Sequence, residues 1–208
     1  MLRAYQALLL IGPPGSGKST QGKILGMLPG FHYWEAGEAL RAIDSDSDIG
    51  RVIHQHSSHG ELIPDELMVS LCLDDLKARV TAGVYHPKTD ILVLDGIPRS
   101  VKQAALLEAQ VTVIKILHLL CSDVEPLIQR LRRRATEQDR MDDAEERVIR
   151  HRLAVYQRTT AQVLTYYPAR CIATIDALRP PAEVLDQILH VLIPLLSRQA
   201  MTEGYPLS

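Results

Sequence analysis

The residues best suited to chemistry form one glycine-rich segment near the N-terminus, Gly12-Pro13-Pro14-Gly15-Ser16-Gly17-Lys18-Ser19-Thr20. It fits the pattern G-x-x-x-x-G-K-[ST] and lies between an apolar run at 7–11 and a predicted helix. Its glycines let successive backbone N–H groups point inward and bind an anion, and the helix N-terminus adds partial positive charge. A plain surface turn is the alternative, and it is disfavoured because every required position agrees.

The segment predicts a site for the phosphates of a nucleotide, with ATP and Mg²⁺ as the expected ligands. Lys18 is placed to reach the β- and γ-phosphates, and the Ser19 hydroxyl is placed to ligate Mg²⁺. The predicted ATP-binding residues of the segment are Gly12, Gly15, Ser16, Gly17, Lys18, Ser19 and Thr20. The segment alone does not define the reaction.

A carboxylate suited to the metal comes at the end of a second apolar run, where Asp95 follows residues 91–94. In proteins with this kind of phosphate loop, an acid at such a place holds Mg²⁺ directly or through water. We expect Asp95 to do so through water, opposite Ser19. A simple Asp-Gly turn at the end of a strand is the alternative interpretation.

Six arginines stand at the ends of predicted elements: Arg41, Arg99, Arg130, Arg134, Arg140 and Arg152. Phosphoryl transfer between two nucleotides gathers negative charge in one cleft, and a well-placed arginine there contributes about 10³–10⁵ in rate. Arg130 and Arg134 share a helix face, and Arg140 follows across a turn, so these three can converge. The intervening Arg132 and Arg133 are expected to form a solvated face.

The composition is that of an ordinary globular chain of 208 residues, 46% hydrophobic and 23% charged, which predicts one domain over 1–208. A net charge of −2 and only 4% aromatic residues argue against a nucleic-acid surface. No apolar run approaches the roughly 18 residues of a membrane span, and the N-terminal run reads as a first strand, not a signal peptide. The three cysteines are typical of buried thiols in a reducing compartment, so we expect a cytoplasmic protein.

The elements that must position these side chains alternate between strands and helices. Strands are predicted at 5–11, 31–34, 91–95, 111–120 and 171–175. Helices are predicted at 17–28, 37–43, 49–58, 64–82, 101–109, 123–134, 142–167 and 181–196, with a polar break at 136–141. This order predicts an α/β fold with a five-stranded parallel sheet and helices on both faces. Ligands of such sheets bind at the carboxyl ends of the strands, where 12–20, 35–41 and 95–99 converge.

With these residues in place, the chain resembles the adenylate kinases and their nucleoside-monophosphate kinase relatives from Leu8 to Tyr167. The loop continued by Gln21-Gly22 is similar to that family's version, and Gly60 to Leu67 resembles the edge of its monophosphate pocket. Leu94-Asp-Gly-Ile-Pro-Arg99 resembles its signature D-G-[FY]-P-R, with Ile97 in place of the aromatic residue. Arg140-Met-Asp-Asp143 and Arg152-Leu-x-x-Tyr156 resemble the segment after its lid.

The resemblance implies a P-loop NTPase-type fold with a small helical monophosphate-binding insertion at about 35–65 and a short lid at about 134–141. It implies a reversible, Mg²⁺-dependent transfer of the ATP γ-phosphoryl group to AMP, giving two ADP. The expected partners are the small molecules ATP and AMP, or another monophosphate, without nucleic acid or membrane, and the expected state is a monomer.

The resemblance also implies a role for each matched residue. Lys18, Arg134, Arg140 and Arg152 would surround the transferring group, Arg41 and Arg99 would hold the acceptor's phosphate, and Arg130 would lie against the ATP adenine. The backbone of Glu61, Leu62 and Ile63 and the side chain of Gln103 would fix the acceptor base, and Ala36, Gly37 and Gly96 would line the acceptor site. The catalytic set is therefore Lys18, Arg99, Arg134, Arg140 and Arg152.

The chain departs from the family pattern in three places. Only 135–139 separate Arg134 from Arg140, so no zinc insert fits in the lid. The usual Ser-Thr-Gly-Asp is replaced by Glu35-Ala36-Gly37-Glu38, and Ala36 is the choice of pyrimidine-specific relatives, whereas Gln103 is the adenine-type choice. We give Gln103 more weight because its amide can pair bidentately with an adenine edge. The distance from Asp143 to Arg152 is one residue longer than expected, which leaves Arg150 as an alternative to Arg152.

Three alternative functions follow from these observations. A related kinase that prefers UMP or CMP is the nearest. A nucleotide-gated binding protein without phosphoryl transfer is a second, although such a protein does not need six arginines. An RNA-binding ATPase is a third, and it would require RNA-stimulated hydrolysis and a salt-dependent affinity.

Overall fold

The protein is described by a computed structural model that covers residues 4–138 and 145–203. Its centre is a parallel sheet of β1 (Tyr5–Ile11), β2 (Phe31–Glu35), β3 (Ile91–Asp95), β4 (Val111–Leu120) and β5 (Ile172–Asp176). The strand order is β2-β3-β1-β4-β5, and all four pairings are parallel. The five-stranded parallel sheet predicted from the sequence is therefore confirmed.

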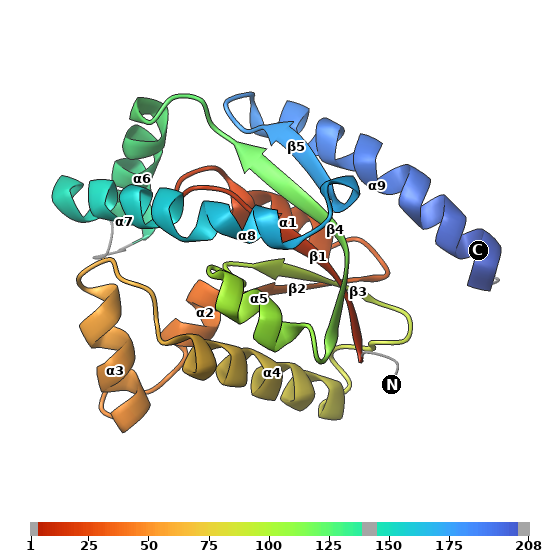
Figure 1. Cartoon of the computed structure of the whole chain (residues 1–208), viewed down its shortest axis with the longest axis horizontal. Helices are drawn as coiled ribbons and strands as arrows, with labels where there is room; N and C mark the ends of the chain where they lie inside the picture. The colour runs from red at the N-terminus through yellow and green to blue at the C-terminus, as the bar shows by residue number, and fades with distance from the viewer. Residues whose placement is uncertain (1–3, 139–144, 204–208) are drawn as a thin grey trace.

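The helices cover both faces of this sheet (Figure 1). They are α1 (Lys18–Gly26), α2 (Ala36–Arg41), α3 (Asp48–Ser57), α4 (Asp65–Thr81), α5 (Val101–Leu107), α6 (Glu125–Gln138), α7 (Glu146–Arg158), α8 (Val163–Tyr166) and α9 (Pro181–Glu203). Two 3₁₀ turns, Thr160–Gln162 and Ala169–Cys171, flank α8. No helix in the described ranges combines the length and the apolar character needed to span a membrane.

The central strand β1 divides its side chains between two cores, as expected from the period of two along a strand. Leu9 and its alternate neighbours pack with α4 and α5 on one face. Leu8 and Leu10 pack with Leu25 of α1 and Ile188 of α9 on the other face. Because β1 is buried on both sides, it holds the loop that follows it at a fixed place in the molecule.

The carboxyl ends of three neighbouring strands meet at one edge of the sheet. Asp95 of β3 is the register partner of Leu10 in β1 and of Glu35 in β2. The phosphate loop follows β1, and α2 follows β2. The register therefore brings three polar segments to one place, as the order of elements predicted.

The helix predicted at 142–167 is not continuous, and this expectation was wrong over its described part. α7 ends at Arg158, Thr159 has φ −120° and ψ −55°, and a 3₁₀ turn then leads into α8. The Thr160 hydroxyl donates to the carbonyl oxygen of Arg99 at 3.0 Å, and the Thr159 hydroxyl donates to Val155 O at 2.6 Å. Hydroxyls that bond to backbone in this way compete with regular helix, so the chain bends where it meets the segment after β3.

The polar break predicted from residue 136 was also wrong at its start, because α6 continues to Gln138. The segment contains Ala135, Glu137 and Gln138, which are good helix formers, and only Thr136 disfavours helix. The rest of the predicted short lid, including Arg140, lies outside the described residues.

Candidate active site

The phosphate loop runs from the end of β1 to the start of α1, and its glycines are required by close packing. A Cβ on Gly12 would lie 2.7 Å from the carbonyl oxygen of Leu119, and one on Gly15 would lie 2.9 Å from that of Leu127. Gly15 has φ +80°, and Gly17, which precedes the first residue of α1, has φ +90°. The loop is therefore seated against β4 and α6, with the N-terminus of α1 open to an anion.

Ser16 provides a second indication that this loop receives a ligand. Its Oγ is buried, and among the described residues it has no hydrogen-bond partner. A buried hydroxyl without a partner costs free energy, about 1–3 kcal/mol. A phosphate oxygen in the loop would satisfy it, which fits the predicted role of Ser16.

Lys18 lies over the loop that it follows. Its Nζ donates to the carbonyl oxygens of Gly12 at 2.7 Å and Pro13 at 3.0 Å. Burial lowers the pKa of Lys18 to about 8 against a raising effect of Asp95, and the guanidinium groups of Arg99, Arg134 and Arg152 lower the pKa further. Three guanidinium groups, from α6, α7 and the segment after β3, therefore lie close enough to Lys18 to disfavour its charged form.

Asp95 is buried at the end of β3 and accepts two hydrogen bonds on one oxygen. The Ser19 hydroxyl donates to Oδ2 at 2.9 Å, and the Tyr33 hydroxyl donates to the same atom at 3.0 Å. Carboxylate and hydroxyl oxygens are hard ligands of the kind that Mg²⁺ prefers, and this ion usually keeps several waters and takes its remaining ligands from substrate phosphates. The pair Ser19 and Asp95 fits the predicted metal site beside the loop.

Arg99 is fixed at the start of α5 by contacts on its backbone and side chain. Its Nε donates to the carbonyl oxygen of Gly96 at 2.9 Å, and its backbone N–H donates to Oε1 of Gln103 at 2.7 Å. Gly96 has φ +84°, and a Cβ there would approach both Ala36 Cβ and Arg99 Nη2 to 3.1 Å. Gly96 thus allows Arg99 to lie beside the β2–α2 junction, and these predicted acceptor residues come together.

Gln103 is fully buried, and part of its amide is already used. Its Oε1 accepts from Arg99, so a base could use only the second lone pair of this oxygen together with the amide N–H₂ group. The bidentate pairing predicted for Gln103 therefore requires Oε1 to accept two hydrogen bonds.

The predicted edge of the monophosphate site contacts the helix that carries Arg152. Gly60 has φ +74°, and a Cβ there would lie 2.9 Å from Arg152 Cγ. The Glu61 carboxylate lies 2.7 Å from Nε2 of His151. The segment from Gly60 to Ile63 is thereby joined to α7, on the side where Arg152 approaches Lys18.

Arg130 lies on the other side of the loop, toward β5. Its Nη1 donates to the carbonyl oxygen of Ala177 at 2.9 Å, just after β5 ends. This contact holds the guanidinium between α6 and the β5–α9 connection. The role of Arg130 at the ATP adenine stays a prediction.

A matching family model and curated relatives identify the family. The family model for adenylate kinase matches residues 10–172. The chain belongs to the adenylate kinase family. Among its relatives, adenylate kinase of Kocuria rhizophila is 35% identical over 191 residues, which cover 89% of this chain and 97% of the relative. Adenylate kinases of a Cyanothece species (36% identical, 88% and 93% covered) and of Thermus thermophilus (34%, 88% and 95%) match over similar lengths.

Within this adenylate kinase fold, Arg150 and Arg152 have different surroundings. Arg150 Nε donates to Glu146 at 2.8 Å, and Arg150 Nη2 donates to Glu125 at 3.2 Å. These partners lie on exposed surface, whereas Arg152 is one of the charges that lower the pKa of Lys18. Arg132 and Arg133 pair with Glu146 and Glu137 in exposed positions, as expected of a solvated face.

Tyr33 is a polar residue beside Asp95 that the sequence analysis missed, and Glu35, which lies in the predicted segment 35–41, was given no role of its own. Tyr33 Oη lies 3.0 Å from Asp95 Oδ2 and 3.3 Å from Glu35 Oε2. One signal was available, because the carboxyl ends of the predicted strands were expected to converge and residues 33 and 35 share a face. The order of the strands, which the sequence did not supply, was needed to use it.

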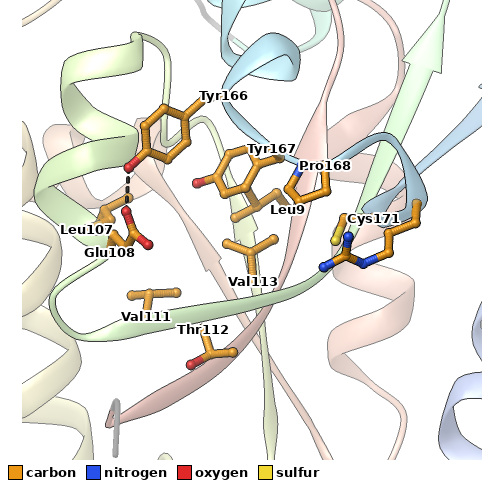
Figure 2. A pocket seen from close by; sticks show the side chains of 11 residues that line it. Leu9, Leu107, Glu108, Val111, Thr112, Val113, Tyr166, Tyr167, Pro168 and Cys171 are labelled. Atoms are coloured by element: carbon orange, nitrogen blue, oxygen red, sulfur yellow. Dashed lines mark hydrogen bonds between the residues drawn. The ribbon is translucent and has the colours of Figure 1, made fainter. Parts of the chain in front are cut away.

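A cavity of about 370 Å³ lies elsewhere, between α5, α8 and the first residues of β4. Figure 2 shows Tyr166 at its rim, with the hydroxyl bonded to the Glu108 carboxylate, and Val111, Thr112 and Val113 along its floor. Its lining includes none of the predicted site residues. The predicted site residues gather at the carboxyl ends of the strands, apart from this cavity.

Proposed function

We propose that the protein catalyses the reversible, Mg²⁺-dependent transfer of the γ-phosphoryl group of ATP to AMP, giving two ADP. The convergence of Lys18, Arg99, Arg134 and Arg152 beside the phosphate loop is the observation that carries this proposal. Four positive groups beside the phosphate loop attract anions, and two nucleotides bring many negative charges. Membership of the adenylate kinase family supports the same reaction.

On the donor side, the loop from Gly12 to Thr20 binds the ATP phosphates through backbone N–H groups and the Ser16 hydroxyl. Lys18 moves from the carbonyls of Gly12 and Pro13 to the phosphate oxygens, which offer a full negative charge in their place. Arg134 and Arg152, with Arg140 as a further predicted member, neutralise the charge that spreads over the transferring group. Arg130 holds the adenine side of ATP.

On the acceptor side, Arg41 and Arg99 bind the AMP phosphate, and Gln103 with the backbone of 61–63 orients the base. Ala36, Gly37 and Gly96 leave room for the nucleotide. These contacts fix the AMP phosphate oxygen in line with the γ-phosphorus, so that positioning supplies much of the rate and no general base is required.

Ser19 and Asp95 would hold the Mg²⁺ that accompanies ATP, with Asp95 expected to do so through water. The ion would supply charge neutralisation at the phosphate oxygens. The Ser19–Asp95 hydrogen bond of 2.9 Å supports this pairing, because both oxygens already face one another beside the loop.

The remaining predictions concern the domain organisation, the location and the oligomeric state of the protein. We propose a single domain with a monophosphate-binding insertion at about 35–65 and a short lid at about 134–141 that close over the substrates and exclude water. We also propose a cytoplasmic location, which the free thiols of Cys72, Cys121 and Cys171 support. A monomeric state stays a prediction that sedimentation equilibrium tests.

The choice of acceptor is tested by a panel of monophosphates. AMP, UMP, CMP and GMP at equal concentration are supplied with MgATP, and formation of each diphosphate is followed by chromatography. AMP is expected to give the highest kcat/KM because of Gln103. A higher value for UMP or CMP would favour the related kinase indicated by Ala36.

A further inference from the structure

The Tyr33 hydroxyl lies between two carboxylates at the edge of the active site. It lies 3.0 Å from Oδ2 of Asp95 and 3.3 Å from Oε2 of Glu35. Ser19 donates to the same Asp95 oxygen at 2.9 Å. Since a phenol carries one proton, Tyr33 bonds to one carboxylate at a time and keeps both within reach.

The backbone places the three residues together. Glu35 and Asp95 are register partners in neighbouring parallel strands, and Tyr33 projects from the same face of β2 as Glu35. The Tyr33 ring packs on α1, where a Cβ on Gly22 would lie 2.1 Å from its ring and one on Gly26 would lie 2.5 Å from its Cβ. The ring therefore has little freedom to carry the hydroxyl elsewhere.

The hydroxyl lies between two acidic groups at the ends of neighbouring strands. Its oxygen is 3.0 Å from the Asp95 carboxylate and 3.3 Å from the Glu35 carboxylate, so it stands between groups that would otherwise face one another.

At its other end, Glu35 reaches the arginine predicted to hold the acceptor's phosphate. Glu35 Oε1 lies 3.6 Å from Arg41 Nη2, with the Glu35 side chain 7% exposed and that of Arg41 51% exposed. A Cβ on Gly37 would lie 3.0 Å from Arg41 Nη1 and 3.2 Å from Glu35 Oε1, so the pair closes over this glycine. The carboxylate of this pair is buried, and the guanidinium group is exposed to solvent.

We propose that Tyr33 and Glu35 are positioning residues that link Arg41, on the acceptor side, to Asp95, on the metal side. The proposal rests on the proposed function for the roles of these two end residues. Binding of Mg²⁺ next to Asp95 and binding of the AMP phosphate at Arg41 then depend on one series of polar contacts. A substitution of Tyr33 or Glu35, in the middle of this series, affects binding at both Asp95 and Arg41.

The test measures binding by isothermal titration calorimetry in the whole protein. Two quantities are compared, the Kd for AMP and the Mg²⁺ concentration that half-saturates ATP binding. The variants are Tyr33→Phe, which keeps the ring on α1, and Glu35→Gln, which keeps the shape but removes the charge. Tyr166→Phe is the matched control, since it also removes a hydroxyl from a carboxylate, Glu108, but at the cavity between α5 and α8, which none of the predicted site residues lines (Figure 2).

The proposed link between Asp95 and Arg41 predicts that Tyr33→Phe raises both quantities by about threefold to tenfold, as expected for the loss of the net contribution of one ordinary hydrogen bond. Glu35→Gln is expected to raise the AMP Kd by a similar factor, and the double variant by no more than the larger single effect, because both act through one path. Tyr166→Phe is expected to change neither quantity.

An unchanged AMP Kd in Tyr33→Phe, or fully additive effects in the double variant, would overturn the link. A protein that binds MgATP but not AMP would instead overturn the proposed function. In that case the Mg²⁺ measurement still tests the role of Tyr33. If the Mg²⁺ concentration that half-saturates ATP binding is unchanged in Tyr33→Phe, Tyr33 does not position Asp95.

Discussion

The ammonium group of Lys18 donates a 2.7 Å hydrogen bond to the carbonyl oxygen of Gly12, at the start of its own loop. A lysine held in this way is close to the phosphate site but bonded to neutral acceptors. Buried among cations, it is easier to deprotonate than an ordinary lysine. ATP binding exchanges these neutral partners for anionic ones, and this exchange has a measurable consequence.

ATP binding is expected to take up a proton at alkaline pH. Burial lowers the pKa of Lys18 to about 8, and bound phosphates favour the charged form and raise the pKa again. Near pH 9 most unliganded molecules carry neutral Lys18, so binding takes up close to one proton and the affinity falls as pH rises through 8. Near pH 6.5 the uptake is close to zero.

Calorimetry of MgATP binding in two buffers of different ionisation enthalpy measures this uptake directly. Lys18→Arg is the control, since arginine stays charged and binding should take up no proton from this position. Equal heats in both buffers at about pH 9 for the unsubstituted protein would contradict the prediction.

Lys18→Ala should lower kcat by at least about 10²-fold while the fold is retained, because one preformed electrostatic contact to the reacting phosphates is lost. Relief of a buried charge should leave the thermal midpoint equal or higher. Lys23→Ala, in the exposed last turn of the same helix, is the control and should keep its activity. Steady-state rates and circular dichroism melting curves check both, and comparable losses in the two variants would argue against the role of Lys18.

Arg152→Ala should lower kcat by about 10³-fold or more, whereas Arg150→Ala should change it less than about threefold. The reason is that Arg152 shares its surroundings with Lys18, and Arg150 is occupied by Glu125 and Glu146 on the surface. Both substitutions remove one positive charge from α7, so the pair controls for net charge. The opposite ranking in steady-state assays would assign the site to Arg150.

Gly96→Ala should reduce stability and raise the KM for AMP. An alanine at φ +84° costs about 1–2 kcal/mol, and its Cβ would also approach Ala36 and Arg99 to 3.1 Å. Gly83→Ala is the matched control, since Gly83 has φ +68° with nothing within 4 Å of the added Cβ. Urea unfolding should show a lower free energy of unfolding for both variants. The KM for AMP should rise only in Gly96→Ala. An unchanged KM in Gly96→Ala would exclude close packing of Arg99 as a determinant of AMP binding.

The parts of the fold that the sequence predicted are those governed by local pattern. The unbroken apolar runs of β1 and β3 and the loop before α1 each carry their signal within a few residues. The bend at Thr159 was missed because its cause, the bond from Thr160 to the carbonyl of Arg99, joins residues 61 positions apart. Tyr33 was missed for the same reason, since its partner Asp95 is 62 positions away.

The candidate site could be assembled from sequence only where a motif fixed the position. Ser19 and Asp95 were paired from the chemistry of the loop, and they lie within hydrogen-bond distance. Arg150 and Arg152 could not be separated by spacing alone. Their distinct surroundings depend on how α7 packs against α6 and on which acids lie nearby.

The most direct test of the central claim is the stoichiometry of the reaction, followed by ³¹P NMR. The purified protein with Mg²⁺ is given equal amounts of ATP and AMP, and separately ADP alone. The account predicts two ADP for each ATP and AMP consumed, approach to the same equilibrium mixture from both directions, and no inorganic phosphate. ATP loss with release of inorganic phosphate, or no AMP-dependent formation of ADP, would contradict it.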